Sequence, residues 1–252
     1  MADAGTVLVT GAARRIGAVI ARHLAGEGWR VAIHYHEHAD EALALADALP
    51  GGAVALPGDL ADPAAPAALV ASARAAFGAP LVALVNNASL FRFDTPPLID
   101  PALLGEHHAV NLVAPALLAA ALALQDDLAD GAVVNLLDQK LANPNPDFFS
   151  YSSARFALGG ATVMLAQALG PRIRVNAVSP GITLPSGDQT EEQFRAVANR
   201  NLLRRPVAID DIARAVAWLL RARGVTGQNL FVDCGQRFLP SARDVMFEAT
   251  HG

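Results

Sequence analysis

The sequence predicts a single-domain α/β fold, a doubly wound seven-stranded parallel sheet flanked by helices on both faces. Short apolar runs alternate with helical stretches along the chain, which is the pattern of a parallel sheet covered on both sides. Hydrophobic residues make up 53% of the 252 residues, enough to bury both faces of such a sheet. No internal repeat, linker or composition shift marks a second domain. We therefore expect one domain over residues 1–252.

Seven short apolar runs are the expected strands. They are Thr6–Thr10, Arg30–Tyr35, Ala53–Leu56, Leu81–Val85, Ala132–Leu137, Ile173–Val178 and Asn229–Val232. The expected helices between them are Ile16–Glu27, Asp40–Leu49, Ala64–Phe77, Pro101–Leu124, Ser150–Ala168 and Asp210–Arg221. Gly26 and Gly28 lie where the first helix should end, and Asp210 lies where the last should begin.

Two segments do not fit this alternation. Residues 180–201 form the longest stretch without clear periodicity, and we expect them to be a mobile substrate loop over a site. Residues 239–252 follow the last expected strand, and we expect them to form a C-terminal arm rather than part of the core.

Composition narrows the classes of function. The net charge is −5 with no basic block, so we expect no nucleic-acid partner. No apolar run of membrane-spanning length is free of charges or prolines, so we expect no membrane span. The single cysteine, Cys234, cannot form an internal disulfide, which fits a reducing cytoplasm. The expected protein is cytoplasmic and handles a small molecule.

A glycine turn follows the first expected strand. Gly11 and Gly17 stand between Thr6–Thr10 and the first expected helix. In such a strand–turn–helix unit, backbone N–H groups and the positive helix end face a pyrophosphate. Tight turns need glycine for their own geometry as well, but the position after the first strand favours a dinucleotide site.

Tyr151 and Arg155 are four residues apart in an expected helix, so their side chains project from the same face. A free tyrosine titrates near ~10 and is a poor proton donor at neutral pH unless a cation stabilises the phenolate. The pair therefore indicates acid–base chemistry.

Together these motifs resemble the short-chain dehydrogenase/reductase family, which has the Rossmann fold, over about residues 6–238. The family's glycine motif is Thr-Gly-x-x-x-Gly-x-Gly, and this chain has Arg15 at the middle glycine. That substitution is typical of the pteridine reductase branch, in which the arginine reaches cofactor phosphate and substrate. The resemblance implies NADP preference through Arg14, because a basic residue there can pair with the 2′-phosphate.

The segment His34-Tyr35-His36-Glu37-His38 ends the second expected strand. Alternation places its three histidines on one side, but no carboxylate or cysteine cluster accompanies them, so we predict no metal site. The segment resembles the one with which pteridine reductases grip the 2′-phosphate, except that Glu37 stands where they have arginine. A carboxylate repels a phosphate but accepts hydrogen bonds from a bare ribose. We therefore favour NADP(H) and keep NAD(H) open.

Three positions resemble a pterin site rather than a carbonyl site. In the pteridine reductase motif that Ser89 and Phe91 match, the phenylalanine stacks a flat pterin against nicotinamide and the serine hydrogen-bonds the ring. Asp138 stands where most of the family has serine, and a carboxyl beside a tyrosine can relay a proton to a ring nitrogen. Taken alone, Phe91 could equally pack on the core and Asp138 could equally cap a turn.

The resemblance assigns the site residues as follows. Catalysis falls to Asn111, Asp138, Tyr151 and Arg155. Substrate contacts fall to Arg15, Ser89, Phe91, Asp138 and Tyr151. Cofactor contacts fall to Gly11, Arg14, Arg15, Ile16, Gly17, His36, Glu37, His38, Asp59, Leu60, Asn87, Ala88, Tyr151, Arg155, Pro180, Gly181 and Thr183.

The predicted function is an NAD(P)H-dependent oxidoreductase that reduces a dihydropterin or dihydrofolate. Arg155 stands where the family has lysine, and arginine supplies the charge but cannot release a proton. Two alternatives therefore stay open: a carbonyl or alcohol dehydrogenase/reductase of the same family, and a cofactor-binding member with impaired catalysis. The resemblance also implies a homotetramer or homodimer built on the helices near Pro101–Leu124 and Ser150–Ala168.

Overall fold

The computed structural model describes residues 4–185 and 189–248. Its centre is a seven-stranded parallel sheet in the order β3-β2-β1-β4-β5-β6-β7. The strands are β1 Thr6–Val9, β2 Arg30–Tyr35, β3 Val54–Pro57, β4 Ala83–Asn86, β5 Gly131–Leu136, β6 Ile173–Pro180 and β7 Asn229–Val232. This confirms the predicted single-domain doubly wound fold; β2 and β7 have the predicted bounds, and the ends of the other strands differ by at most two residues.

The central strands are buried on both faces. Along β1, Val7 and Val9 belong to one apolar cluster while Leu8, between them, belongs to the cluster on the other face. Because successive side chains of a strand point to opposite faces, a strand covered on both sides must be apolar throughout. This explains why the strands are readable as short continuous apolar runs.

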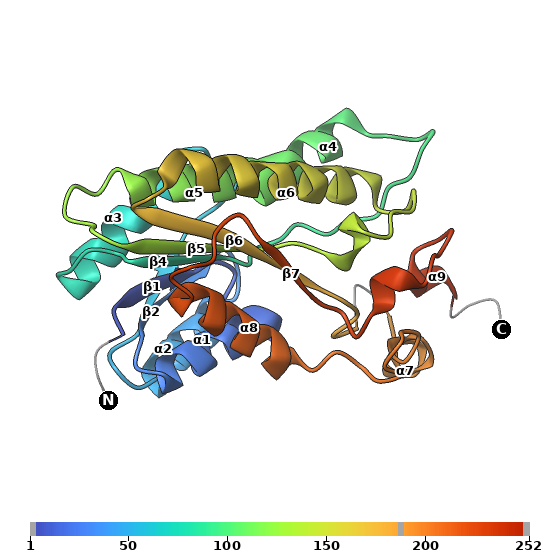
Figure 1. The fold of residues 1–252 in the computed structure, drawn as a ribbon, viewed down its shortest axis with the longest axis horizontal. Coiled ribbons are helices and arrows are strands. Elements are labelled where there is room, and N and C mark those ends of the chain that lie inside the picture. Colours follow the sequence, from blue (N-terminus) through green and yellow to red (C-terminus); the bar gives the residue numbers. More distant parts are fainter. Residues whose placement is uncertain (1–3, 186–188, 249–252) are drawn as a thin grey trace.

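Two helical layers cover the sheet (Figure 1). One face carries α1 Arg15–Gly26, α2 Ala39–Ala48 and α8 Ile209–Arg221. The other carries α3 Ala65–Phe77, α4 Pro101–His108, α5 Ala114–Ala123 and α6 Phe149–Leu169. Two short elements, α7 Glu191–Ala198 and α9 Val245–Glu248, lie together beyond the sheet, past the carboxyl ends of the strands.

The long helix predicted at Pro101–Leu124 is interrupted. Between α4 and α5, residues Ala109–Val113 form a π-helical segment, η1. Pro115 lacks the N–H that an α-helix would direct to the carbonyl of Asn111, so the regular hydrogen-bond ladder cannot continue there. The interruption lies beside the loop that follows β4, because Asn111 is hydrogen-bonded to Leu90 of that loop.

The predicted loop at 180–201 contains a helix that periodicity did not reveal. α7 begins with a capping box in which the Thr190 side chain accepts from the Gln193 backbone and Gln193 reaches back. Eight residues are too few to display a clear period. Residues 186–188 of this loop, and residues 249–252 of the predicted arm, lie outside the described part of the chain. Short helical turns η2 Gln139–Leu141 and η3 Gln236–Phe238 complete the fold.

No helix in the described ranges is both long and apolar enough to cross a membrane.

Candidate active site

Two cavities adjoin at the carboxyl ends of the strands. The smaller, about 510 Å³, lies over the glycine turn and the end of β2. It collects most of the predicted cofactor residues: Gly11, Arg14, Arg15, Ile16, Gly17, His36, Glu37, His38, Asp59, Leu60, Asn87 and Ala88. The larger, about 1070 Å³, collects the predicted substrate and catalytic residues Arg15, Ser89, Phe91, Asp138, Tyr151 and Arg155, together with the remaining predicted cofactor contacts Pro180, Gly181 and Thr183.

The glycine turn is packed so closely that side chains are excluded from it. A Cβ on Gly17 would lie 2.4 Å from the Gly11 carbonyl oxygen, and one on Gly11 would lie 2.8 Å from the Ala88 Cα. Asn87, which directly follows the neighbouring strand β4, holds the turn, because its Nδ2 donates to the Thr10 and Gly11 carbonyls at 2.9 and 3.0 Å. α1 then begins without a side-chain cap. Its first N–H groups are available to an anion, so the residues present fit a dinucleotide pyrophosphate.

Arg15 joins the two cavities. Its backbone has φ 54°, in the left-handed region that favours glycine, which explains why the family has glycine at this position. Its Nη2 donates to the Pro185 carbonyl at 2.8 Å, and its side chain lines both cavities. One arginine therefore adjoins both the cofactor turn and the substrate side.

His34 has a structural part that its sequence context did not reveal. It is 2% exposed, its Nδ1 accepts from the Gly11 backbone N–H at 3.0 Å, and its Nε2 lies 3.1 Å from the Gly58 carbonyl. Burial lowers its pKa, which favours the neutral ring that this pairing requires. His34 thus connects the glycine turn to β2.

The strand itself carries only the first of the three histidines. β2 ends at Tyr35, and His38 has a left-handed backbone with φ 65°, so the strand alternation does not continue through His36 and His38. All three histidines line the smaller cavity, and the His34 ring also accepts from the Gly11 N–H of the glycine turn. Within 4–185 and 189–248, no group of three potential ligand side chains could hold a metal ion.

The loop after β4 is held by Asn111. Its Oδ1 accepts from the Leu90 N–H at 2.9 Å and its Nδ2 donates to the Leu90 carbonyl at 2.8 Å. Asn111 is fully buried and lines neither cavity. Its side chain therefore acts on the site by fixing Ser89 and Phe91, and its predicted catalytic part stays a prediction.

Asp138 and Tyr151 form the reacting pair. Asp138 follows β5 and Tyr151 lies in the first turn of α6, and the Tyr151 hydroxyl donates to Asp138 Oδ2 at 2.8 Å. Asp138 keeps part of its surface toward the cavity but is shielded from bulk water, and this desolvation raises its pKa. Burial, reinforced by the neighbouring Asp138 charge, also raises the pKa of Tyr151. Both groups therefore favour their protonated forms.

Arg155 lies against the ring of Tyr151, one turn further along α6. It is 2% exposed, its Nη1 donates to the Leu136 carbonyl at 2.9 Å, and its guanidinium carbon is 5.3 Å from the centre of the Tyr151 ring. Its charge lowers the pKa of Tyr151, against the larger effect of burial. Arg155 therefore places a guanidinium beside the Tyr151 ring, and its roles in catalysis and cofactor binding stay predictions.

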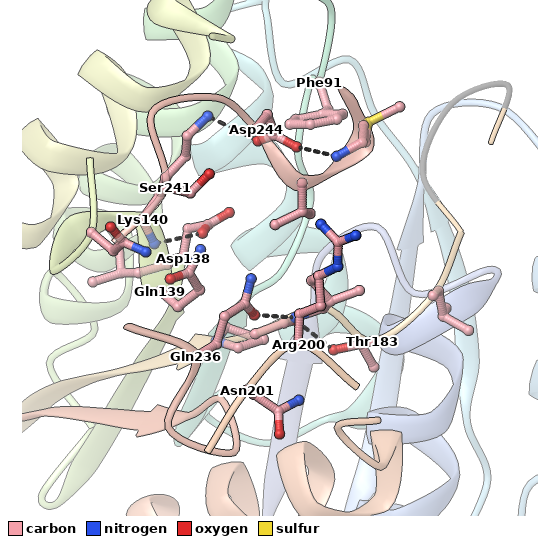
Figure 2. Close-up of a pocket in the computed structure, with 18 of the residues that line it drawn as sticks. Phe91, Asp138, Gln139, Lys140, Thr183, Arg200, Asn201, Gln236, Ser241 and Asp244 are labelled. Carbon is pink, nitrogen blue, oxygen red and sulfur yellow. Dashed lines mark hydrogen bonds and ion pairs between the residues drawn. The ribbon is translucent and has the colours of Figure 1, made fainter. Parts of the chain in front are cut away.

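Aromatic side chains form one wall of the larger cavity. Phe91 stacks on Phe148 with ring centres 4.1 Å apart and meets Tyr151 edge-on at 4.8 Å. Phe91 lies opposite Gln236 and Thr183 across the cavity (Figure 2). Backed by Phe148, it presents a firm apolar surface to a flat ring.

Gln236 is a wall residue that the sequence analysis missed. Its Oε1 accepts from the Ile182 N–H at 2.9 Å, and a Cβ on Gly181 would approach that oxygen to 2.7 Å. It therefore shapes the start of the predicted substrate loop from a segment more than fifty residues away. No local pattern around Gln236 signals this contact.

Fold and site together define a dinucleotide-binding oxidoreductase domain. A family model described as enoyl-(acyl carrier protein) reductase matches residues 11–237. The chain belongs to the short-chain dehydrogenase/reductase family. It is 30% identical to the 3-oxoacyl-[acyl-carrier-protein] reductase FabG of Staphylococcus aureus over 249 residues, covering 91% of this chain and 97% of that protein.

Other relatives match the predicted branch. The chain is 30% identical to pteridine reductase 1 of Leishmania tarentolae over 280 residues, covering 92% of this chain and 96% of that protein. It is 41% identical to FolM alternative dihydrofolate reductase 1 of Brucella canis complexed with NADP, with a TM-score of 0.91 and coverage of 97% and 98%. The Brucella suis protein, also complexed with NADP, gives 41% and 0.90, with coverage of 97% and 99%. The predicted relation to pteridine and alternative dihydrofolate reductases is confirmed.

Proposed function

We propose that this protein uses NADPH to reduce a ring C=N bond of a dihydropterin or dihydrofolate. The observation that carries the proposal is the 2.8 Å hydrogen bond from Tyr151 to Asp138, in the position where carbonyl reductases of the family have serine. Pteridine reductase 1 and the two FolM structures with NADP support the substrate class and the cofactor.

The pair suits an imine rather than a ketone. NADPH supplies the hydride, which goes to the ring carbon, and the ring nitrogen takes one proton, so one C–H and one N–H bond form as NADP⁺ is released. In our proposal Tyr151 delivers that proton and Asp138, whose raised pKa favours the protonated carboxyl, resupplies it. Arg155 keeps its proton throughout, so the carboxyl takes over the proton route that lysine provides in relatives.

The 2′-phosphate side of the cofactor cavity carries mixed charge. Arg14 and His36 line it together with Glu37 and Asp59, and His36 Nδ1 lies 3.9 Å from Asp59 Oδ1. We assign NADPH on the strength of Arg14 and of the relatives that hold NADP. Glu37→Arg should then strengthen NADPH over NADH by tenfold or more, which titration of cofactor fluorescence would measure.

The assay that tests the proposal follows NADPH oxidation with dihydrobiopterin, dihydromonapterin and dihydrofolate, for the natural chain and Arg155→Lys in parallel. Turnover by the natural chain is the expected result. Activity of the lysine variant alone would identify a pterin site with a lost proton route. If neither form turns over any of these substrates while NADPH still binds, the proposal is overturned in favour of a non-catalytic protein. Faster reduction of ketones would overturn it in favour of a carbonyl reductase.

We also propose a cytoplasmic homotetramer or homodimer. Large apolar side chains are exposed along α5 and α6, including Leu117 at 37%, Phe156 at 43% and Met164 at 63%. Exposed apolar surface concentrated on two adjacent helices favours contact with another subunit. Light scattering during size-exclusion chromatography would give the subunit number, and a monomer at micromolar concentration would refute the proposal.

A further inference from the structure

The described part of the C-terminal arm, residues 239–248, closes the larger cavity of its own chain. α9 lies beside α7 at the edge of the site (Figure 1), and Ser241 and Asp244 stand near Lys140 and Phe91 (Figure 2). The arm residues that line the cavity are Leu239, Pro240, Ser241, Asp244, Val245 and Met246. The arm is therefore a wall of the substrate site.

Lys140 holds this wall through a buried ion pair. Its Nζ donates to Asp244 Oδ2 at 3.0 Å and to the Asp147 carbonyl at 2.6 Å, with the lysine side chain 4% exposed. The ammonium also lies 5.4 Å from the centre of the Phe148 ring. Removing one member of a buried pair leaves the other charge unpaired, so loss of either side chain should weaken docking of the arm.

Further contacts join the arm to the segment between β5 and α6. The Asp147 carboxylate accepts from Arg243 Nε and from the Asp244 backbone N–H, both at 2.7 Å. Asn143 Nδ2 donates to the Leu239 carbonyl at 2.8 Å. The same segment carries Asp138, so the arm and the reacting carboxyl share one support.

We propose that Lys140 is a positioning residue that docks the C-terminal arm through Asp244 and thereby completes the substrate cavity beside Asp138. The backbone N–H of Lys140 donates to Asp138 Oδ1 at 2.8 Å, so one residue contacts both the reacting carboxyl and the arm. This inference rests on the proposed reduction of a pterin or folate in the larger cavity.

The pair places two opposite charges near Asp138. Burial is the main cause of its raised pKa; the Asp244 charge raises that pKa further, whereas Lys140 lowers it. Tyr151 and Arg155 face the same carboxyl region from α6, and Arg15, Arg200 and Arg204 stand elsewhere on the cavity wall. Loss of either partner frees the arm, but the two losses change the charge beside Asp138 in opposite directions.

The test compares Lys140→Met with Asp244→Asn. In both variants KM for dihydrofolate should rise about tenfold, while the Kd for NADPH changes less than about twofold, because no arm residue is a predicted cofactor contact or lines the smaller cavity. The basic limb of the kcat–pH profile should move to higher pH in Lys140→Met and to lower pH in Asp244→Asn. Arg214→Met, which removes an exposed pair with Asp211 on α8, is the control and should change neither quantity.

A structural lesion alone would move both pH profiles the same way or leave them fixed, and either result would overturn the proposal. Hydrogen exchange separates this failure from that of the proposed function. Amides of residues 239–248 should exchange at least tenfold faster in both variants than in the natural chain, without substrate. Unchanged exchange would refute docking by Lys140 even if no pterin is ever reduced, and fast exchange with a silent assay would refute only the proposed function.

Discussion

The two cavities are built by different means. The pyrophosphate end of the smaller cavity, called here the cofactor cavity, is formed by backbone: a glycine turn held by the Asn87 amide, and an uncapped helix start. The larger cavity, called here the substrate cavity, is formed by side chains from β5, α6, the loop after β4 and the C-terminal arm. Backbone N–H groups recognise the phosphates that many ligands share, whereas the side chains of the larger cavity set the reaction. The comparison explains how one fold keeps its cofactor while its substrates change.

Tyr151→Phe should separate the two cavities most sharply. Removing the hydroxyl that donates to Asp138 takes away the proton donor, and general acid catalysis contributes about 10²–10⁴-fold. We expect kcat to fall by about that range, while the Kd for NADPH rises at most about twofold, because the smaller cavity is untouched. Stopped-flow kinetics with fluorescence titration would measure both. Retained turnover would assign the proton to another group.

The rate constant kcat should depend on pH through a group of the substrate cavity, whereas NADPH binding should not. Asp138 is competent as a donor when protonated, and burial raises its pKa, so kcat should be constant at low pH and fall as pH rises through that raised pKa. Asp138→Asn should lose at least tenfold in kcat and lose this limb of the profile. The Kd for NADPH should change neither with pH over this range nor in the Asp138→Asn variant. A limb that persists in the asparagine variant would show that a different group titrates.

Gly17→Ala should damage the cofactor cavity. Its Cβ would lie 2.4 Å from the Gly11 carbonyl oxygen, and overpacking costs about 1–3 kcal/mol. If the turn must keep its shape to bind the cofactor, NADPH binding should weaken roughly 5- to 150-fold. Gly26→Ala in the same helix is the matched control, because no atom lies within 4 Å of its Cβ position. Equal affinities for the two variants would refute the importance of close packing in the turn.

The smallest effect concerns Arg15, which borders both cavities. Arg15→Gly and Arg15→Ala both lose the bond to the Pro185 carbonyl, but only glycine relieves the left-handed backbone at φ 54°. The glycine variant should therefore be about 1 kcal/mol more stable than the alanine variant, while both show raised KM. Urea unfolding of the two variants side by side would detect the difference, and equal stability would show that no strain is held there.

The same contrast determines what the sequence could predict. The strands and the glycine turn are local patterns, in which burial on both faces or a tight approach dictates residue type. Asp138 and Tyr151 were brought together by the resemblance to pteridine reductases, and the structure joins them by a hydrogen bond. Their predicted neighbour Arg155 lies against the ring of Tyr151.

The missed features depend on contacts between distant segments. Lys140 and Asp244 are 104 residues apart, and neither has a neighbour pattern that marks a buried ion pair. His34 was recognised only as part of the segment that resembles the 2′-phosphate site of pteridine reductases, although its ring supports the glycine turn. The helix α7 is too short for its periodicity to exceed that of an irregular loop. In each case tertiary packing, rather than local preference, selects the structure.

Arg15 also has a thermodynamic consequence. Because Arg15 belongs to the walls of both cavities, a change in its position on cofactor binding would alter the substrate side as well. Linkage then requires reciprocity: the factor by which NADPH alters substrate affinity must equal the factor by which substrate alters NADPH affinity. A folate analogue that uses this guanidinium would bind cooperatively with the cofactor, and its potency would depend on the cellular ratio of NADPH to NADP⁺.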